Sequence, residues 1–210
     1  MNGVYSKFLN LKSEKQEKIL EAAIEEFADK GFKKASTNEI IKEAQISKGI
    51  LFHYFKNKKN LFLFVYDYSV ELIMDEFSKK VDWGEVDFFI KLRQIASVKF
   101  ELVNIHPKIF KFFEGAVIEE CAEVKDEIEE RNKNLSESNY SKLFENIDVT
   151  KFNDGIDVGR AINIVMWTLD GFGKSELQKA KVSESKQLNY EKIFSEMDVY
   201  MTMCKKCFYK

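Results

Sequence analysis

A single proline, Pro107, and nine glycines are spread over a chain of 210 residues. Proline removes a backbone donor and glycine costs backbone entropy on folding, so both usually interrupt regular structure. So few interruptions over this length favour helices joined by short turns rather than many strands. Hydrophobic residues make up 45% of the chain and charged residues 32%, which suits amphipathic helices. The sequence therefore predicts an all-α fold, with about nine helices by hydrophobic periodicity.

The formal net charge of -2 is unevenly distributed along the chain. Residues 1–60 contain twelve lysines and eight carboxylates, a net charge of +4, whereas the remaining residues carry -6. This asymmetry indicates an N-terminal module that binds anions, attached to a neutral-to-acidic body.

The apolar residues Ile19, Ala23 and Phe27 repeat every four positions and predict an amphipathic helix over residues 13–30. Gly31 is expected to end this helix, because glycine adopts the left-handed cap conformation without a Cβ clash.

Two shorter helices are expected next. In the run Ser36-Thr37-Asn38-Glu39, the Ser36 hydroxyl can cap the Glu39 amide while Glu39 reaches back to the Ser36 amide, which predicts a helix over about 37–44. After three residues, Ser47 is a second candidate N-cap, for a helix ending near Phe55. Two short helices joined by a tight turn form a helix-turn-helix.

Beyond residue 60 the helical periodicity continues, with short polar connections at 82–84, 132–138 and 183–185. A long helix from Leu61 to about Val81 can tie the N-terminal module to the rest of the chain. The remaining helices are predicted over residues 86–105, 107–133, 136–147, 156–180 and 188–207.

The run from Ile40 to Leu61 (IIKEAQISKGILFHYFKNKKNL) closely resembles the DNA-binding signature of the TetR family of bacterial regulators. The resemblance covers about residues 13–62 and includes Gly31-Phe32 after the first helix. It implies a three-helix DNA-binding domain over residues 1–60 and a helical effector-binding and dimerisation domain over 61–210. It also implies a homodimeric repressor that binds a palindromic operator in double-stranded DNA and leaves it when a small molecule binds.

The recognition helix of such a domain presents its first turn to the major groove. Lys48 can reach a guanine or a phosphate, whereas Ile50 offers an apolar contact best satisfied by a thymine methyl. Ser36, Thr37 and Lys58 lie at helix N-termini, where amides and side chains suit phosphates. The residues predicted to contact DNA are Ser36, Thr37, Ser47, Lys48, Gly49, Ile50, Phe52, His53, Tyr54 and Lys58.

Two positions depart from the family pattern. Phe52 stands where the family often has tyrosine and lacks the hydroxyl, while His53 and Tyr54 can each still donate to a phosphate. Gln45 replaces the usual turn glycine, at a cost of roughly 1 kcal/mol if its backbone is left-handed. A helical hairpin inside an ordinary all-α bundle would explain the apolar positions equally well, but not the Ser-Lys-Gly start or the local positive charge.

Phenylalanines are frequent between residues 88 and 113, where the matching family helices surround a ligand cavity. This implies a hydrophobic or aromatic effector, oriented by His106 or Glu114. The same aromatic residues would also suit a plain core, and His106 before Pro107 would suit a helix cap. The residues predicted to bind the effector are Phe89, Phe100, His106, Phe110, Phe113, Glu114 and Trp167.

The last two predicted helices carry many apolar residues, some of which must face the core of their own chain. The resemblance implies that these helices pair with those of a second copy in a four-helix bundle. The residues predicted to lie in this dimer interface are Ile162, Met166, Leu169, Phe172, Phe194, Met197 and Met201.

Several functions find no support in the sequence. Cys204 and Cys207 have the spacing of half a zinc site without a second pair, so we expect no metal, and no cofactor motif is present. No phosphate loop, activated nucleophile or Glu-x-x-His pair indicates an enzyme. The alternatives to a regulator are a helical-bundle enzyme and an architectural or adaptor protein that senses no ligand. Without an export signal or a long apolar run, we expect a cytoplasmic protein with no membrane partner.

Overall fold

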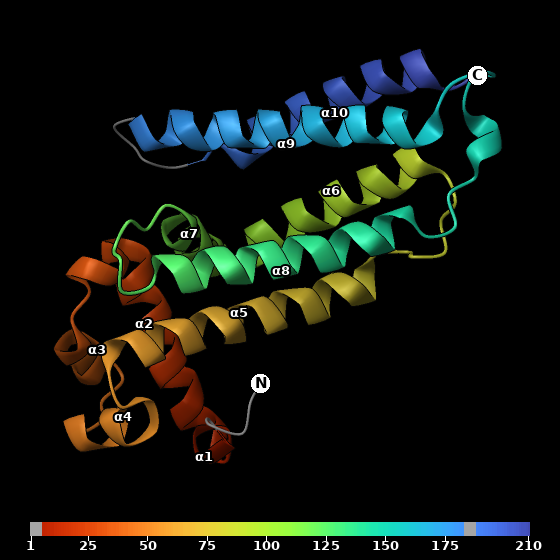
Figure 1. Ribbon diagram of the computed structural model, residues 1–210. Helices are drawn as coiled ribbons and strands as arrows, with labels where there is room; N and C mark the ends of the chain where they lie inside the picture. Colours follow the sequence, from red (N-terminus) through yellow and green to blue (C-terminus); the bar gives the residue numbers. More distant parts are fainter. Residues whose placement is uncertain (1–5, 183–187) are drawn as a thin grey trace. The chain divides into compact units, whose positions relative to one another are not determined.

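The computed structural model describes residues 6–182 and 188–210, and their regular elements are helices apart from one isolated β-bridge, between Phe152 and Tyr209 (Figure 1). The all-α prediction is confirmed. The predicted connection at 183–185 lies outside the described residues. The elements are α1 (Ser6–Leu9), α2 (Ser13–Lys34), α3 (Thr37–Glu43), α4 (Lys48–Phe55), α5 (Lys58–Lys80), α6 (Phe88–Ile105), α7 (Pro107–Val117), α8 (Lys125–Phe144), the 3-10 helix η2 (Val149–Lys151), α9 (Val158–Val182) and α10 (Tyr190–Phe208).

The helices form two compact units. One consists of the residues up to Ser78 together with His106–Glu137, and the other of Lys79–Ile105 together with Ser138–Lys210. The first unit thus combines the predicted helix-turn-helix with α7 and the start of α8. The second unit contains α6, α9 and α10.

An aromatic core fills the first unit. The ring of Phe62 on α5 contacts Phe27 and Phe32 of α2 at centroid distances of 4.9 and 5.2 Å, and Phe112 of α7 at 5.3 Å. Edge-to-face ring pairs of this kind add to the stabilisation from burial. Helix α7 packs along α2 through this core. Exposed ion pairs at its edge, such as Lys108 with Glu25, contribute little.

Helix α1 was not expected from the sequence. Its Phe8 is completely buried and contacts the rings of Tyr54, Phe55 and Phe64 at 4.9 to 5.8 Å. Burying a phenylalanine side chain stabilises a fold by roughly 1.5–3 kcal/mol. A segment before the predicted helix-turn-helix therefore supports its last helix from behind.

The predicted helix over 107–133 and the predicted break at 132–138 are wrong. Helix α7 ends at Val117, a loop covers 118–124, and α8 runs without interruption across 132–138. The cause is a distant contact, because the Glu119 carboxylate accepts hydrogen bonds from the amides of Phe32 (2.7 Å) and Cys121 (3.1 Å). These bonds fix a loop where periodicity alone favoured a helix.

The second unit has an apolar core with buried charges beside it. Asp87 caps α6 by accepting from the amides of Phe89 (3.0 Å) and Ile90 (3.1 Å), and pairs with Lys151 at 2.9 Å. Lys91 is fully buried and donates to the carbonyl of Glu145 at 2.9 Å. The apolar part of this core is formed by Phe88, Phe89, Leu92, Phe152, Ala161, Ile162, Val165 and Met201.

Candidate nucleic-acid interface

Helix α4 has one buried face and one exposed face. Leu51 and Phe55 are each 1% exposed, which anchors the helix in the first unit. Ser47, Lys48 and Gly49 are exposed in the first turn. Of the other predicted contact residues on α4, His53 is exposed, and Ile50, Phe52 and Tyr54 are half-buried.

The turn between α3 and α4 contains a residue with a left-handed backbone. Gln45 has a φ of 53°, so the condition under which this residue costs roughly 1 kcal/mol relative to glycine is met. The amide of Ala44 donates to the carbonyl of Ile40 at 2.9 Å, and the amide of Ile46 donates to the carbonyl of Ile41 at 3.1 Å. The backbone amides on both sides of Gln45 are therefore hydrogen-bonded.

The two serine N-caps occupy the predicted positions, but neither hydroxyl makes a cap hydrogen bond. The predicted capping box of Ser36 with Glu39 is therefore wrong. The Ser36 amide donates instead to the carboxylate of Glu26, at 2.7 Å, because α2 brings this glutamate beside the start of α3. The hydroxyls of Ser36 and Ser47 are thus not used to cap their own helices.

Lys58 performs a structural task at the start of α5. Its ammonium donates to the carbonyls of Lys33 (3.3 Å) and Ala35 (3.2 Å) and lies 4.6 Å above the ring of Phe32. These carbonyls are at the end of α2, where helical partners are missing. A phosphate contact by Lys58 would have to share the ammonium with these carbonyls.

Two aromatic residues of α4 also support neighbouring groups. The ammonium of Lys48 lies 5.9 Å from the ring centre of Phe52, and the ring of Tyr54 contacts both His53 and Phe8. Phe52 therefore lies against the cation that is predicted to reach the bases, although it lacks a hydroxyl of its own.

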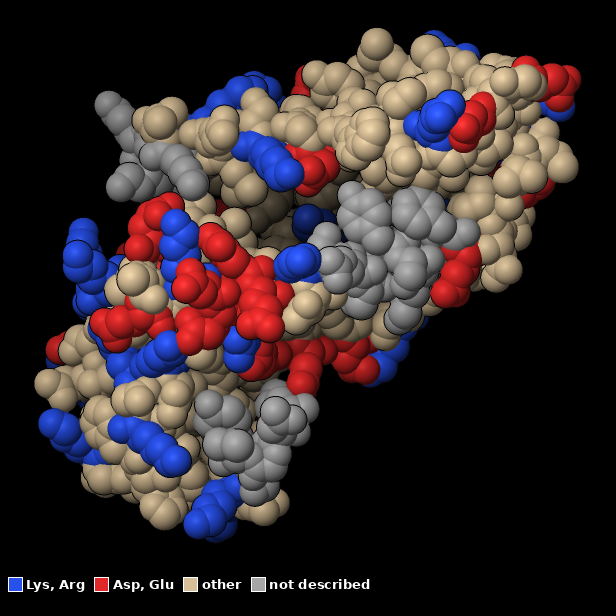
Figure 2. Space-filling model, viewed as in Figure 1, with Lys and Arg blue, Asp and Glu red and all other residues tan. Residues whose placement is uncertain are grey.

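Charges within the first unit are segregated. Figure 2 shows lysines spread over the end that carries α3 and α4, whereas carboxylates gather over the start of α8. Residues 119–130 include seven carboxylates. Since a polyanion is attracted to the first region and repelled by the second, the α3–α4 end is the electrostatically favoured face for DNA.

Comparison with known proteins agrees with this geometry. Residues 19–65 match the profile of a family described as bacterial regulatory proteins, tetR family. The HTH-type transcriptional regulator YvdT of Bacillus subtilis is 28% identical over 162 residues, covering 76% of this chain and 83% of YvdT. The chain therefore carries the N-terminal module of the tetR family of bacterial regulatory proteins, over residues 19–65. It is a transcriptional regulator that binds DNA, and the relatives are regulators rather than enzymes.

Two further transcriptional regulators extend the comparison. QacR of Staphylococcus aureus is 36% identical over 111 residues, which cover 53% of this chain and 54% of QacR. The structure of FadR from Bacillus subtilis in complex with stearoyl-CoA shares the fold, with a TM-score of 0.62 over 90% of this chain and 96% of FadR at 18% identity.

The predicted effector residues fall into separate clusters. In the first unit, Phe110 and Phe113 have ring centres 5.9 Å apart, and His106 contacts Glu76 at 2.9 Å. Tyr66, which the sequence did not single out, contacts Phe113 at 5.6 Å. Burial, together with the charge of Asp67, raises the pKa of Tyr66 to about 12, so its hydroxyl stays protonated and donates to Asn132 at 2.5 Å.

In the second unit, Phe89 is a core residue packed against Tyr209, and Phe100 contacts Phe194. Trp167 is 70% exposed on α9. Among the predicted dimer residues, Ile162 and Met201 are buried in the core of their own chain, whereas Met166, Leu169 and Met197 are half-buried beside it.

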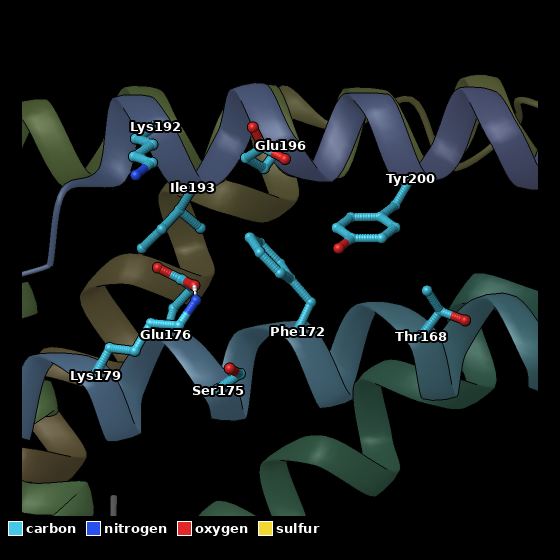
Figure 3. A pocket seen from close by; sticks show the side chains of 9 residues that line it. All are labelled: Thr168, Phe172, Ser175, Glu176, Lys179, Lys192, Ile193, Glu196 and Tyr200. Carbon is cyan, nitrogen blue, oxygen red and sulfur yellow. Dashed lines mark hydrogen bonds and ion pairs between the residues drawn. The ribbon is translucent and has the colours of Figure 1, made fainter.

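A hollow of about 450 Å³ separates one end of α9 from α10 (Figure 3). Phe172 of α9 and Tyr200 of α10 both line it, and their rings contact each other with centres 5.3 Å apart. Glu176 pairs with Lys179 on its α9 side. Apolar and charged groups therefore share this open surface.

Among the residues that the structure describes, none of the helices combines the length and apolar character needed to cross a lipid bilayer. Nor do His, Cys, Asp or Glu side chains of those residues gather in groups of three or more that could hold a metal ion.

Proposed function

We propose that this TetR-family regulator is a repressor that reads a palindromic operator with the first turn of α4. The observation that carries this proposal is the exposed turn Ser47-Lys48-Gly49, which is held in place by the fully buried Leu51 and Phe55. Lys48 and Ile50 are the base-reading candidates in the major groove. Ser36, Thr37, His53, Tyr54 and Lys58 are the candidates for phosphate contacts, which position the protein on the duplex.

We propose a homodimer that pairs through α9 and α10. Apolar side chains are exposed on both helices: Ile164 (45%) and Trp167 (70%) on α9, and Val199 (51%) and Met203 (58%) on α10. A second copy would cover this face and form a four-helix bundle. Phe172 on α9 and Phe194 on α10 remain candidates for the dimer interface. Ile162 and Met201 are buried in the core of each subunit and are not.

A small apolar or aromatic molecule is the proposed effector. Phe110, Phe113 and Tyr66 supply aromatic surface between α5 and α7, with His106 and Glu114 as polar groups nearby in sequence. The neighbour FadR was solved with stearoyl-CoA, which is consistent with an effector that has a long apolar part. The proposed functional division remains residues 1–60 for DNA binding and 61–210 for effector binding and dimerisation.

The proposal predicts a discrete complex between the protein and the DNA flanking its own gene, measured by gel shift with excess nonspecific competitor. Lys48→Ala should weaken this complex by about 1–3 kcal/mol, the usual value of a base-reading contact. Lys42→Ala is the matched control, because Lys42 is an exposed lysine on α3 that lies before the turn. Equal affinities of wild type and Lys48→Ala would contradict the assignment. A complex that competitor abolishes would instead indicate an architectural protein.

The dimer face predicts that Trp167→Glu converts the dimer to a monomer in sedimentation equilibrium, because a buried unpaired carboxylate is costly in an apolar interface. Val117→Glu is the control, since Val117 is a 50% exposed apolar residue of the first unit. An unchanged dimer in Trp167→Glu would exclude this face.

A further inference from the structure

The segment from Gly31 to Ser36 joins α2 to the helix-turn-helix and has an interrupted backbone. Gly31 has a φ of 65° and a ψ of 175°, which breaks the helical hydrogen-bond pattern within α2. In an unbroken helix the Phe32 amide would donate to the carbonyl four residues earlier. At this break it needs another acceptor, because a buried amide without a partner costs free energy.

Three side chains satisfy the backbone of this elbow, defined here as residues 31–36. Glu26 accepts from the Ser36 amide, and Lys58 donates to the carbonyls of Lys33 and Ala35. Both belong to the segment that matches the family profile. The third is Glu119, whose Oε2 accepts from the Phe32 amide at 2.7 Å from 87 residues further along the chain.

The fit between Glu119 and the elbow is close. A Cβ atom at residue 31 would lie 3.1 Å from Oε2 of Glu119, tighter than ordinary van der Waals contact. Glycine is therefore favoured at position 31 both by its positive φ and by the approach of this carboxylate. The other carboxylate oxygen accepts from the Cys121 amide at 3.1 Å, which fixes the side chain to its own loop.

We infer that Glu119 is a positioning residue for DNA binding, which holds the elbow from outside the helix-turn-helix and so sets the direction in which α3 and α4 are presented. Only Ala35 and Ser36 link the end of α2 to the start of α3. A shift of the backbone at Phe32 would therefore move Ser36 and Thr37 as well. The inference rests on the proposed function, because it takes those residues and the first turn of α4 as the DNA contacts.

The loop that carries Glu119 is firmly connected to the rest of the first unit. It begins where α7 ends, one turn beyond the cluster of Phe110 and Phe113, and it leads into α8. Helix α8 is tied to α5 by Arg131, which pairs with Asp67 at 2.7 Å. A shift of α7 or α8 would therefore reach the elbow through Glu119, which makes operator affinity depend on the position of the 118–124 loop.

The test compares Glu119→Ala with Glu119→Gln in the full-length protein. Glutamine keeps an oxygen that can accept from the Phe32 amide, whereas alanine removes the acceptor. Glu120→Ala is the matched control, because Glu120 lies in the same loop but pairs with Lys125 on the surface. Affinity is measured by fluorescence anisotropy on a duplex that the wild type selects from a random library. Hydrogen exchange is measured for the peptide that contains Phe32.

The inference predicts that Glu119→Ala weakens operator binding about tenfold or more, the value of one lost charge-assisted hydrogen bond. Glu119→Gln should stay within about threefold of wild type, and Glu120→Ala should bind like wild type. Exchange at Phe32 should rise in Glu119→Ala alone, while the salt dependence of binding stays unchanged, because no cation on the DNA face is lost.

Wild-type affinity in Glu119→Ala would overturn the inference. So would equal losses in the alanine and glutamine variants, since charge or general stability would then be the cause. If Glu119→Ala does not fold, hydrogen exchange in the wild type is the test. A rapidly exchanging Phe32 amide would overturn the inference, and a protected Phe32 amide would support it. A wild type that selects no duplex would defeat the proposed function, while the exchange measurement would still report on the contact itself.

Discussion

The cores of the two compact units are stabilised by different forces. In the first, rings contact one another around Phe8 and around Phe112, and its buried side chains are almost all apolar. In the second, Asp87 and Lys91 are buried beside the apolar residues and hold α6 to distant segments. An aromatic core is indifferent to protonation, whereas a buried carboxylate is not. The comparison teaches that two compact units of one chain can differ in how their stability depends on pH.

The largest predicted effect concerns Asp87. Burial by itself would raise the pKa of this carboxyl, but the hydrogen bond from Lys151, the Ile90 amide and the nearby charge of Lys205 outweigh it and hold the pKa below its ordinary value. Asp87→Asn should therefore lower the free energy of unfolding of the second unit by about 2–3 kcal/mol at neutral pH. Both tryptophans, Trp83 and Trp167, belong to this unit, so their fluorescence reports its unfolding.

The sign of the pH dependence follows from the lowered pKa. The stabilisation from Asp87 is complete above its unfolded value of 3.8 and is lost as the pH falls through the lower folded value. Tryptophan fluorescence should therefore show acid unfolding at higher pH in Asp87→Asn than in wild type. The exposed N-cap Asp157 provides the control Asp157→Asn, with a smaller shift. Identical acid transitions in wild type and Asp87→Asn would mean that the stability of the second unit does not depend on the Asp87 carboxylate.

The next prediction concerns Lys58, which serves both the fold and the proposed DNA contact. Lys58→Ala should weaken binding to all sequences alike and flatten the slope of log K against log salt by roughly one unit, as for one lost phosphate contact. Lys59→Ala is the matched control, since the neighbouring Lys59 pairs with Glu127. A lower melting temperature with an unchanged slope would mean that Lys58 only caps the carbonyls at the end of α2.

The smallest predicted effect compares two left-handed residues, one in each unit. Gln45 (φ 53°) is of a residue type that resists this conformation, whereas Asn146 (φ 59°) tolerates it. Gln45→Gly should stabilise the protein by about 0.5–1 kcal/mol, and Asn146→Gly by less. Thermal unfolding followed by circular dichroism measures both. A larger gain in Asn146→Gly would show that strain at the turn is relieved elsewhere.

The predictable features of the chain were those with local signals. The spacing of Ile19, Ala23 and Phe27 and the two serines at N-cap positions are local signals, and they located the starts of α2, α3 and α4. Gly31 was expected to end the first of these helices, but α2 continues to Lys34 with a break at the glycine. The family resemblance then identified these helices as a DNA-binding module. At Gln45 the sequence left the backbone conformation open, and the φ of 53° shows that the left-handed one is adopted.

The features that the sequence did not reveal depend on distant contacts. Phe8 has a core position only because α4 and α5 meet above it, and the loop at 118–124 forms because Glu119 bonds to Phe32. The hydrogen-bond partners of Ser36 and Lys58 were also beyond prediction. The candidate DNA contacts followed from position on a helix, whereas the roles of the C-terminal aromatic residues depend on which rings meet, and periodicity does not determine that.

The contact between Phe32 and Glu119 also bears on how the protein is made. Residues separated by 87 positions meet only after the intervening chain has left the ribosome, and closing so long a loop costs entropy that local helices do not incur. Helices α2, α3 and α4 can form early during synthesis, but the elbow gains its last acceptor only when α7 and its following loop have docked. We therefore expect a nascent chain to acquire helical structure at its N-terminus well before its DNA-binding surface reaches its final orientation.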